Sequence, residues 1–149
     1  MATIQMPPDF KDLLRLLNSH CVEYLIIGGY AVAYHGYPRA TMDIDIWVAI
    51  DSQNAVKIVD VLKEFGFNVP ELCPALFQKK NQVIRMGVPP VRIKMLTGIS
   101  GVEFGDCYVN RIDDELDGEP VKIISLKHLK LNKKASGRHQ DLADLEHLP

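Results

Sequence analysis

The stretch from Met42 to Ile50 places acidic residues at alternate positions of an otherwise apolar run, and this pattern constrains the fold most strongly. Alternate side chains of a β-strand share one face, so Asp43 and Asp45 are expected to point the same way while the residues between them point into a core. Two neighbouring carboxylates repel each other, and a bound divalent cation removes that cost. The pattern predicts a buried strand whose polar face can hold a hard ion, Mg²⁺ or alternatively Mn²⁺.

The chain is long enough for one sizeable core and too short for two ordinary domains, because it has 149 residues of which 47% are hydrophobic. We therefore expect a single domain over residues 1–149. No apolar stretch approaches the roughly 20 residues that a membrane span requires. The segment from Met1 to Phe10 lacks the basic and apolar regions of a secretory signal, so we expect a cytoplasmic protein with no membrane partner.

Charge and cysteine content exclude several other classes of protein. The net charge of −2 predicts no general affinity for nucleic acid, although positive residues concentrate between Lys122 and Arg138. The three cysteines show no CxxC spacing, and their odd number leaves at least one thiol unpaired. Free thiols in a reducing compartment and no structural zinc site are the simplest interpretation.

Hydrophobic periodicity and turn residues predict an alternation of helices and short strands along the chain. Asp9 and Ser125 are candidate N-caps, and Gly66 is a candidate helix end. We expect helices at 9–17, 30–35, 52–65, 125–135 and 138–148, and strands at 24–27, 42–50, 82–86, 91–96 and 121–124. The predicted class is α+β, with a mixed β-sheet flanked by helices.

Two adjacent glycines separate the first predicted strand from the helix that follows it. Gly28 and Gly29 allow a tight turn, and the backbone N–H groups at the start of a helix attract phosphate. An isolated Asp-x-Asp pair is also found on solvated strand ends, so the pair alone does not establish a metal site. Together, the glycine turn and the acidic pair predict a phosphate site and a metal site on neighbouring strands.

The sequence resembles the signature of the nucleotidyltransferase superfamily. The residues that carry this resemblance are Gly28-Gly29-Tyr30-Ala31-Val32, His35-Gly36, Arg39, Thr41, Asp43 and Asp45, with Lys133, Gly137-Arg138, Asp141 and Asp144 near the C-terminus. The likeness extends to small bacterial proteins related to the abortive-infection nucleotidyltransferase toxins of type IV toxin–antitoxin systems. It implies a nucleotidyltransferase-like fold that covers most of the chain.

The resemblance also implies an activity, namely transfer of a nucleoside monophosphate from an NTP to a hydroxyl of RNA, protein or a small molecule. It implies a role for several of the matching residues. Gly28 and Gly29 would cradle the triphosphate, and Asp43 and Asp45 would hold Mg²⁺. Lys133 would contact phosphate and Asp141 would orient the acceptor or its base, while Arg39 would add positive charge and Thr41 a hydroxyl. Such a reaction depends mainly on positioning and charge neutralisation.

One position departs from the pattern of the superfamily. Many members carry a third carboxylate in the strand at 91–96, where this chain has Lys94. The ammonium is expected to pair with Asp45 or to weaken Mg²⁺ binding, which puts two-metal catalysis in question. Glu103 or Asp106 could replace the missing carboxylate if the following loop folds back.

Two alternative functions are open, the first because of this departure and the second because the chain lacks the helical extension that larger toxins carry for substrate selection. The first is a catalytically weakened module that binds nucleotide or has a regulatory role. The second is a subunit that binds an antitoxin or a small helical protein.

Several residues also have ordinary structural interpretations. Lys133 lies in a basic run that is typical of a solvated helix face, and Asp141 can be a first-turn residue favoured by the helix dipole. Asp144 can face solvent or pair with a nearby base. His35 is expected to make a contact at a helix end, and Trp47 to cover the sheet or stack on a base.

Overall fold

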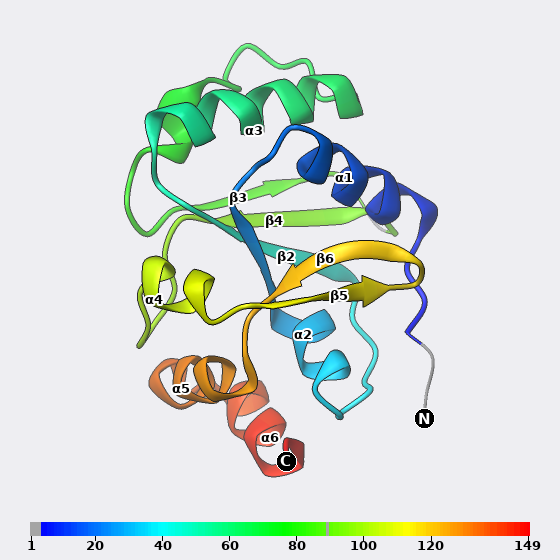
Figure 1. Ribbon diagram of the computed structural model, residues 1–149, viewed down its shortest axis with the longest axis vertical. Helices are drawn as coiled ribbons and strands as arrows, with labels where there is room; N and C mark the ends of the chain where they lie inside the picture. Colours follow the sequence, from blue (N-terminus) through cyan, green and yellow to red (C-terminus); the bar gives the residue numbers. More distant parts are fainter. Residues whose placement is uncertain (1–3, 89) are drawn as a thin grey trace.

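Six strands form a mixed sheet with the order β3-β4-β2-β1-β6-β5 in the computed structural model, which describes residues 4–88 and 90–149 (Figure 1). The strands are β1 (Tyr24–Ile27), β2 (Asp43–Val48), β3 (Val83–Met86), β4 (Arg92–Leu96), β5 (Ile112–Leu116) and β6 (Glu119–Ile123). β2 pairs antiparallel with β1 and parallel with β4, so it lies in the interior of the sheet. This is the strand that carries both aspartates.

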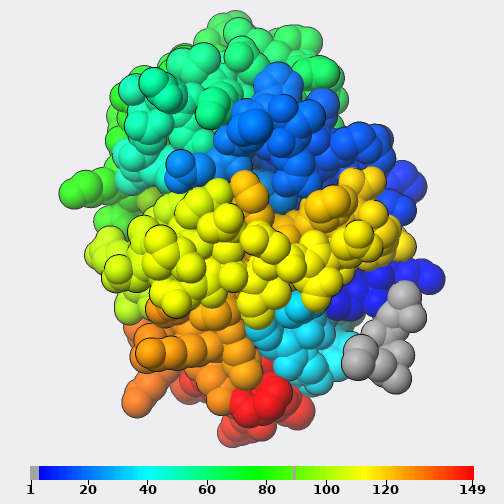
Figure 2. All heavy atoms as spheres, viewed as in Figure 1, coloured from blue at the N-terminus to red at the C-terminus, as the bar shows by residue number. Residues whose placement is uncertain are grey.

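Helices cover both faces of the sheet. They are α1 (Pro8–Ser19), α2 (Gly28–Tyr34), α3 (Ser52–Phe65), α4 (Phe104–Val109), α5 (Leu126–Ser136) and α6 (His139–His147), with a 3₁₀ turn η1 (Pro74–Phe77). In Figure 1, α1 and α3 lie above the sheet, and α2, α5 and α6 lie below it. Figure 2 shows that α4 and β5, coloured yellow, form a band between these two groups.

The alternation along β2 divides its residues between the two faces of the sheet. Ile46 pairs directly with Ile26, and the neighbouring Tyr24 donates a hydrogen bond to Asn18 of α1, so this face packs beneath α1 and α3. Trp47, on the aspartate face, is buried edge-on against Phe104 of α4, with ring centroids 5.1 Å apart. The expectation that Trp47 covers the sheet is confirmed.

The predicted α+β class and most of the predicted elements agree with the structure. The strand at 24–27 and the helix at 52–65 match to the residue. Ser125 caps α5 by accepting a hydrogen bond from the backbone N–H of His128. The Asp9 cap is wrong because Pro7 occupies the cap position and Asp9 lies in the first turn of α1. Helix α2 begins at Gly28, two residues earlier than predicted.

Sequence reasoning missed α4 and β5. The β5 sequence Ile-Asp-Asp-Glu-Leu has three exposed acidic residues in its centre, and it forms the outer strand next to β6. Asp117 and Gly118 both have positive φ angles and join β5 to β6. An Asp-Gly pair between two short runs is a strong hairpin signal, so this dipeptide could have identified the strand.

All three cysteines are free thiols, as expected. Within the described part of the chain, every helix is too short or too polar to cross a membrane.

Candidate active site

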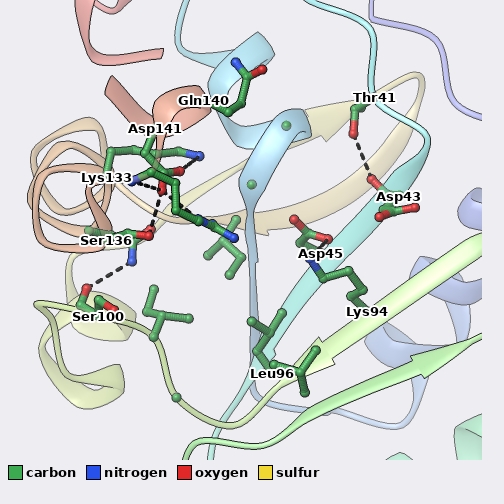
Figure 3. A pocket seen from close by; sticks show the side chains of 18 of the residues that line it. Thr41, Asp43, Asp45, Lys94, Leu96, Ser100, Lys133, Ser136, Gln140 and Asp141 are labelled. Atoms are coloured by element: carbon green, nitrogen blue, oxygen red, sulfur yellow. Dashed lines mark hydrogen bonds and ion pairs between the residues drawn. The ribbon is translucent and has the colours of Figure 1, made fainter. Parts of the chain in front are cut away.

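A pocket of about 520 Å³ lies over the aspartate face of β2 (Figure 3). Its floor is the sheet, and its walls come from the β1–α2 turn and from α5 and α6. The residues that sequence analysis assigned to the site all line it: Gly28, Gly29, Arg39, Thr41, Asp43, Asp45, Lys133 and Asp141. The structure therefore brings together the whole predicted set, from segments more than a hundred residues apart.

The glycine turn packs directly against the acidic strand. A Cβ atom on Gly28 would lie 2.1 Å from Oδ2 of Asp45, and one on Gly29 would lie 2.7 Å from the side chain of Thr41. Gly28 also has a φ angle of +67°, a conformation that side chains disfavour. Only glycine allows the turn to approach the carboxylate this closely, so the two predicted subsites converge.

Asp45 is a partly buried carboxylate, and its neighbours do not fully compensate its charge. Lys94 lies directly beside it in the sheet, with Nζ 3.9 Å from Oδ1, an ion pair longer than a hydrogen bond. Among the described residues, none hydrogen-bonds to this oxygen. Burial raises the pKa of Asp45, Lys94 lowers it and Asp43 raises it, and the net result is a raised pKa. The predicted pairing with Lys94 is confirmed, but the ammonium does not offset the cost of burial.

Asp43 is nearer to the solvent and has a different partner. Its Oδ1 accepts a hydrogen bond of 2.6 Å from Nε of Arg92, whose side chain is largely exposed. The Thr41 hydroxyl donates to the backbone carbonyl of Asp43 rather than to its carboxylate. Thr41 therefore shapes the loop that leads into β2.

The donor set at the pocket floor fits a magnesium ion. Among the described residues, no group of three or more histidine, cysteine, aspartate or glutamate side chains is arranged to hold a metal. An ion at Asp43 and Asp45 would complete its coordination with water and phosphate oxygens, which is how Mg²⁺ is commonly bound. Oδ1 of Asp45 lacks a hydrogen bond and burial raises the pKa of this carboxyl group, and a cation bound there would stabilise its charged form.

Glu103 and Asp106 do not supply a third carboxylate. Glu103 immediately precedes α4 and Asp106 lies in its first turn, and the pocket lining includes neither residue. The loop after β4 contributes Gly98, Ile99 and Ser100 to the pocket lining but no carboxylate.

The wall formed by α5 and α6 contains a buried ion network. Lys133 places Nζ 3.1 Å from Oδ1 of Asp141 and 3.1 Å from Oδ2 of Asp144, and all three side chains are almost completely buried. Arg39 donates two hydrogen bonds to Asp144, of 2.8 and 3.0 Å. The solvated-face interpretation of Lys133 is therefore wrong. Asp144 does not face solvent, and the ion-pair alternative holds for it.

Asp141 accepts hydrogen bonds on both carboxylate oxygens. Oδ1 accepts from Lys133, and Oδ2 accepts from Ser136 and from the backbone and side chain of Arg138. Burial favours the neutral acid, but these hydrogen bonds outweigh it and hold the pKa of Asp141 well below its usual range. Asp141 lies in the first turn of α6, as predicted. Its contacts are those of a residue that positions Lys133 and Arg138.

Two further cations line the pocket, Arg138, which the family resemblance included, and Arg85, which sequence analysis missed. Arg138 caps α6 and extends a side chain that is 75% exposed toward the pocket. Arg85 lies on β3 directly opposite Lys94. The strands at 82–86 and 91–96 were predicted to form a hairpin, and the register of that hairpin could have identified Arg85 as the partner of Lys94. His35, in contrast, ends α2 and contacts the carbonyl of Ile124, as expected for a residue at a helix end.

A sequence model of the family described as aminoglycoside-2''-adenylyltransferase matches residues 9–148. The chain belongs to this family. A search of curated proteins found no match.

Two solved structures share the fold. One is a Thermotoga maritima protein designated a nucleotidyltransferase, with a TM-score of 0.63 and 19% identity over 96% of this chain and 94% of that one. The other is an antigenic nucleotidyltransferase-like protein from Paracoccidioides brasiliensis, with a TM-score of 0.56 and 19% identity over 92% of this chain and 72% of that one. The superfamily and its fold are thus confirmed, while the link to toxin–antitoxin systems stays a prediction.

Proposed function

We propose that this protein transfers a nucleoside monophosphate from an NTP to an acceptor, with Mg²⁺ bound at Asp43 and Asp45. The observation that carries the proposal is the direct packing of Gly28 against the Asp45 carboxylate, in a pocket that Lys133 lines from the opposite wall. A phosphate-binding turn and an uncompensated carboxylate within one pocket match the needs of nucleotidyl transfer, which depends on positioning and charge neutralisation.

Each wall of the pocket has its own role in this proposal. Mg²⁺, when bound, would neutralise charge on the phosphate under attack. Gly28 and Gly29 let the triphosphate approach the backbone closely, and Lys133 and Arg138 add positive charge from α5 and α6. Asp141 holds these two cations in place through its hydrogen bonds. Arg39 acts through Asp144, to which Nε and Nη2 of its guanidinium donate hydrogen bonds.

The transfer itself is an in-line displacement at the α-phosphorus. An acceptor oxygen forms the new P–O bond, the bond between the α-phosphorus and the bridging oxygen breaks, and pyrophosphate leaves. A hydroxyl acceptor also loses its proton, which passes to water. The family description names an aminoglycoside, so a small-molecule hydroxyl is one acceptor class, alongside the RNA and protein hydroxyls.

The test is incorporation of radiolabel from α-labelled NTPs into total RNA, a protein mixture and kanamycin, with and without Mg²⁺. We expect Mg²⁺-dependent incorporation that Asp43→Ala abolishes, because the variant lacks one of two carboxylate ligands. Asp60→Ala removes an exposed carboxylate outside the pocket and should retain full activity. Labelling that persists undiminished in Asp43→Ala would refute the proposal.

The position of Lys94 favours a second candidate, a module that binds nucleotide without turnover. Its ammonium competes with a cation for Oδ1 of Asp45, from which it is 3.9 Å away. Calorimetric titration with ATP and GTP, with and without Mg²⁺, distinguishes the two candidates when it is repeated with Lys94→Asp. Tighter Mg²⁺ binding or new transfer activity in that variant supports the weakened-site candidate, and unchanged behaviour counts against it.

A further inference from the structure

Asp45 lies between two different surfaces of the pocket. In the sheet, its neighbour on one side is Ile27, which leads directly into the glycine turn, and its neighbour on the other side is Lys94. Figure 3 shows Lys94 extending from β4 beside Asp45, with Lys133 and Asp141 on the opposite wall. The strand order β4-β2-β1 thus separates the turn from Lys94 by the width of the acidic strand.

This arrangement assigns a side of the pocket to each reactant, provided that the proposed function holds. In-line displacement requires the attacking and leaving oxygens to lie on opposite sides of the phosphorus. Pyrophosphate belongs on the side of the glycine turn, where Lys133 and Arg138 line the wall. The acceptor must therefore approach over β4 and β3.

The acceptor side of the pocket is cationic. Arg85 and Lys94 are direct partners in the β3–β4 ladder, and both line the pocket. The other described lining residues of these two strands are Val83 and Leu96, and the loop that follows contributes Gly98, Ile99 and Ser100. None of these residues is a carboxylate that could bind an amino group or take a proton from a hydroxyl.

We propose that the acceptor is a small phosphate monoester that carries a hydroxyl, and that Lys94 and Arg85 bind its phosphate. Its hydroxyl oxygen forms the new bond to the α-phosphorus, pyrophosphate leaves, and the hydroxyl proton passes to water. With a cation bound at Asp45, the Lys94 ammonium would be displaced from that carboxylate, and its flexible side chain would be free to turn toward the acceptor. Arg85 offers a planar set of N–H donors that suits a phosphate. The same two charges repel a polycationic aminoglycoside, so this chain differs from its family description in the acceptor that it selects.

Ribose 5-phosphate is the probe, titrated by calorimetry into the full chain saturated with Mg²⁺ and α,β-methylene-ATP, so that the triphosphate subsite is already occupied. Ribose and kanamycin are the neutral and cationic comparisons. We expect ribose 5-phosphate alone to bind. Lys94→Gln and Arg85→Gln should each weaken its binding by about tenfold or more, as expected when one charged hydrogen-bonding partner of a phosphate is lost. Lys80→Gln, at an exposed site outside the pocket, should not change the affinity.

Two results would overturn the acceptor assignment. One is tighter binding of kanamycin than of ribose 5-phosphate, and the other is binding of ribose 5-phosphate that neither Lys94→Gln nor Arg85→Gln weakens. The affinity for the methylene analogue, measured in the same variants, shows whether they remain folded and competent. If the wild-type chain binds the analogue with Mg²⁺ but does not bind ribose 5-phosphate, the acceptor proposal fails and the proposed function stands. If it does not bind the analogue, the proposed function fails as well.

Discussion

The two acidic regions of the pocket are built differently. On the α5–α6 wall, Lys133 lies 3.1 Å from both Asp141 and Asp144, and every charge of this network has a close partner. On the sheet floor, Lys94 approaches Asp45 only to 3.9 Å, and the buried Oδ1 of that carboxylate has no hydrogen-bond partner among the described residues. Both regions are acidic and largely buried, but only the wall is electrostatically closed.

This difference indicates a division of labour between the two regions. A closed network of buried charges fixes side-chain positions, and it is costly to break because any remaining partner is left buried and uncompensated. A carboxylate whose oxygen lacks a hydrogen bond destabilises the protein when no ligand is bound, and a bound ligand can remove that destabilisation. We therefore expect substitutions in the wall to change stability first, and substitutions in the floor to change ligand binding first.

The largest effect is expected from Asp144→Asn. The side chain is completely buried and binds both Lys133 and Arg39, so its neutralisation leaves two cations with too little negative charge. The loss of unfolding free energy should be about 3–5 kcal/mol, measured by urea denaturation. Asp60→Asn, an exposed carboxylate on α3, is the matched control and should change stability by less than about 0.5 kcal/mol. Equal effects of the two substitutions would contradict the closed-network description.

Magnesium should stabilise the protein through the floor alone. A ligand at 100 times its Kd that binds only the folded state raises the unfolding free energy by about 2.7 kcal/mol, and the melting temperature rises accordingly. Asp45→Asn should abolish this increment, while in the absence of metal the variant should be at least as stable as the wild type, because a buried charge has been removed. The melting temperature, measured by calorimetry at increasing Mg²⁺ concentrations in the absence of Ca²⁺, tests this. An undiminished Mg²⁺ response in Asp45→Asn would place the ion elsewhere.

The sheet floor could be predicted because its determinants are local. Two-residue alternation places Asp43 and Asp45 on one face, and the glycine pair ends the preceding strand. The departure at Lys94 was visible through the family resemblance, and pairing with Asp45 was one of the two expected consequences; the parallel register that places the two side by side is seen only in the structure. Short-range periodicity was enough to identify this part of the site.

The family resemblance assigned Lys133 and Asp141 of the wall to the site, but their burial and pairing could not be predicted, because these depend on how α5 and α6 pack. Lys133 lies within a run of basic residues, and its sequence context does not distinguish it from exposed neighbours such as Lys134. The pairing of Arg39 with Asp144 joins positions 105 residues apart. Tertiary packing decides which member of a charged run becomes buried, and one sequence does not contain that information in a local pattern.

The close approach of turn and floor can be tested at Gly28. Gly28→Ala imposes both a disfavoured φ angle and an overlap with the Asp45 carboxylate, 2.1 Å from the new Cβ. Gly118→Ala imposes a similar backbone conformation, with φ at +83° and no atom within 4 Å of the Cβ. Urea denaturation should show Gly28→Ala to be less stable than Gly118→Ala by about 1–3 kcal/mol, the usual cost of overpacking. Equal losses would mean that the turn does not depend on its contact with Asp45.

The pH dependence of stability should have opposite signs in the two regions. At the floor we expect the smallest effect of all, because Lys94 partly offsets the rise in the pKa of Asp45 that burial causes. Burial raises the pKa of Asp45 above its ordinary value of 3.8, so its contribution is present at low pH and is lost as the pH rises through the raised pKa. Burial would raise the pKa of Asp144 too, but hydrogen bonds from Arg39, Lys133 and Gln140 outweigh it and lower that pKa.

The contribution of Asp144 is therefore present above 3.8 and is lost as the pH falls through its lowered pKa. Unfolding free energies of metal-free protein, measured in urea from pH 2.5 to about 6, should separate the two carboxylates. The advantage of Asp45→Asn over the wild type should grow with pH above about 4, whereas the deficit of Asp144→Asn should shrink as the pH falls below that value. If both differences changed in the same direction, burial and not pairing would control both carboxylates, and the floor would be no more open to a cation than the wall.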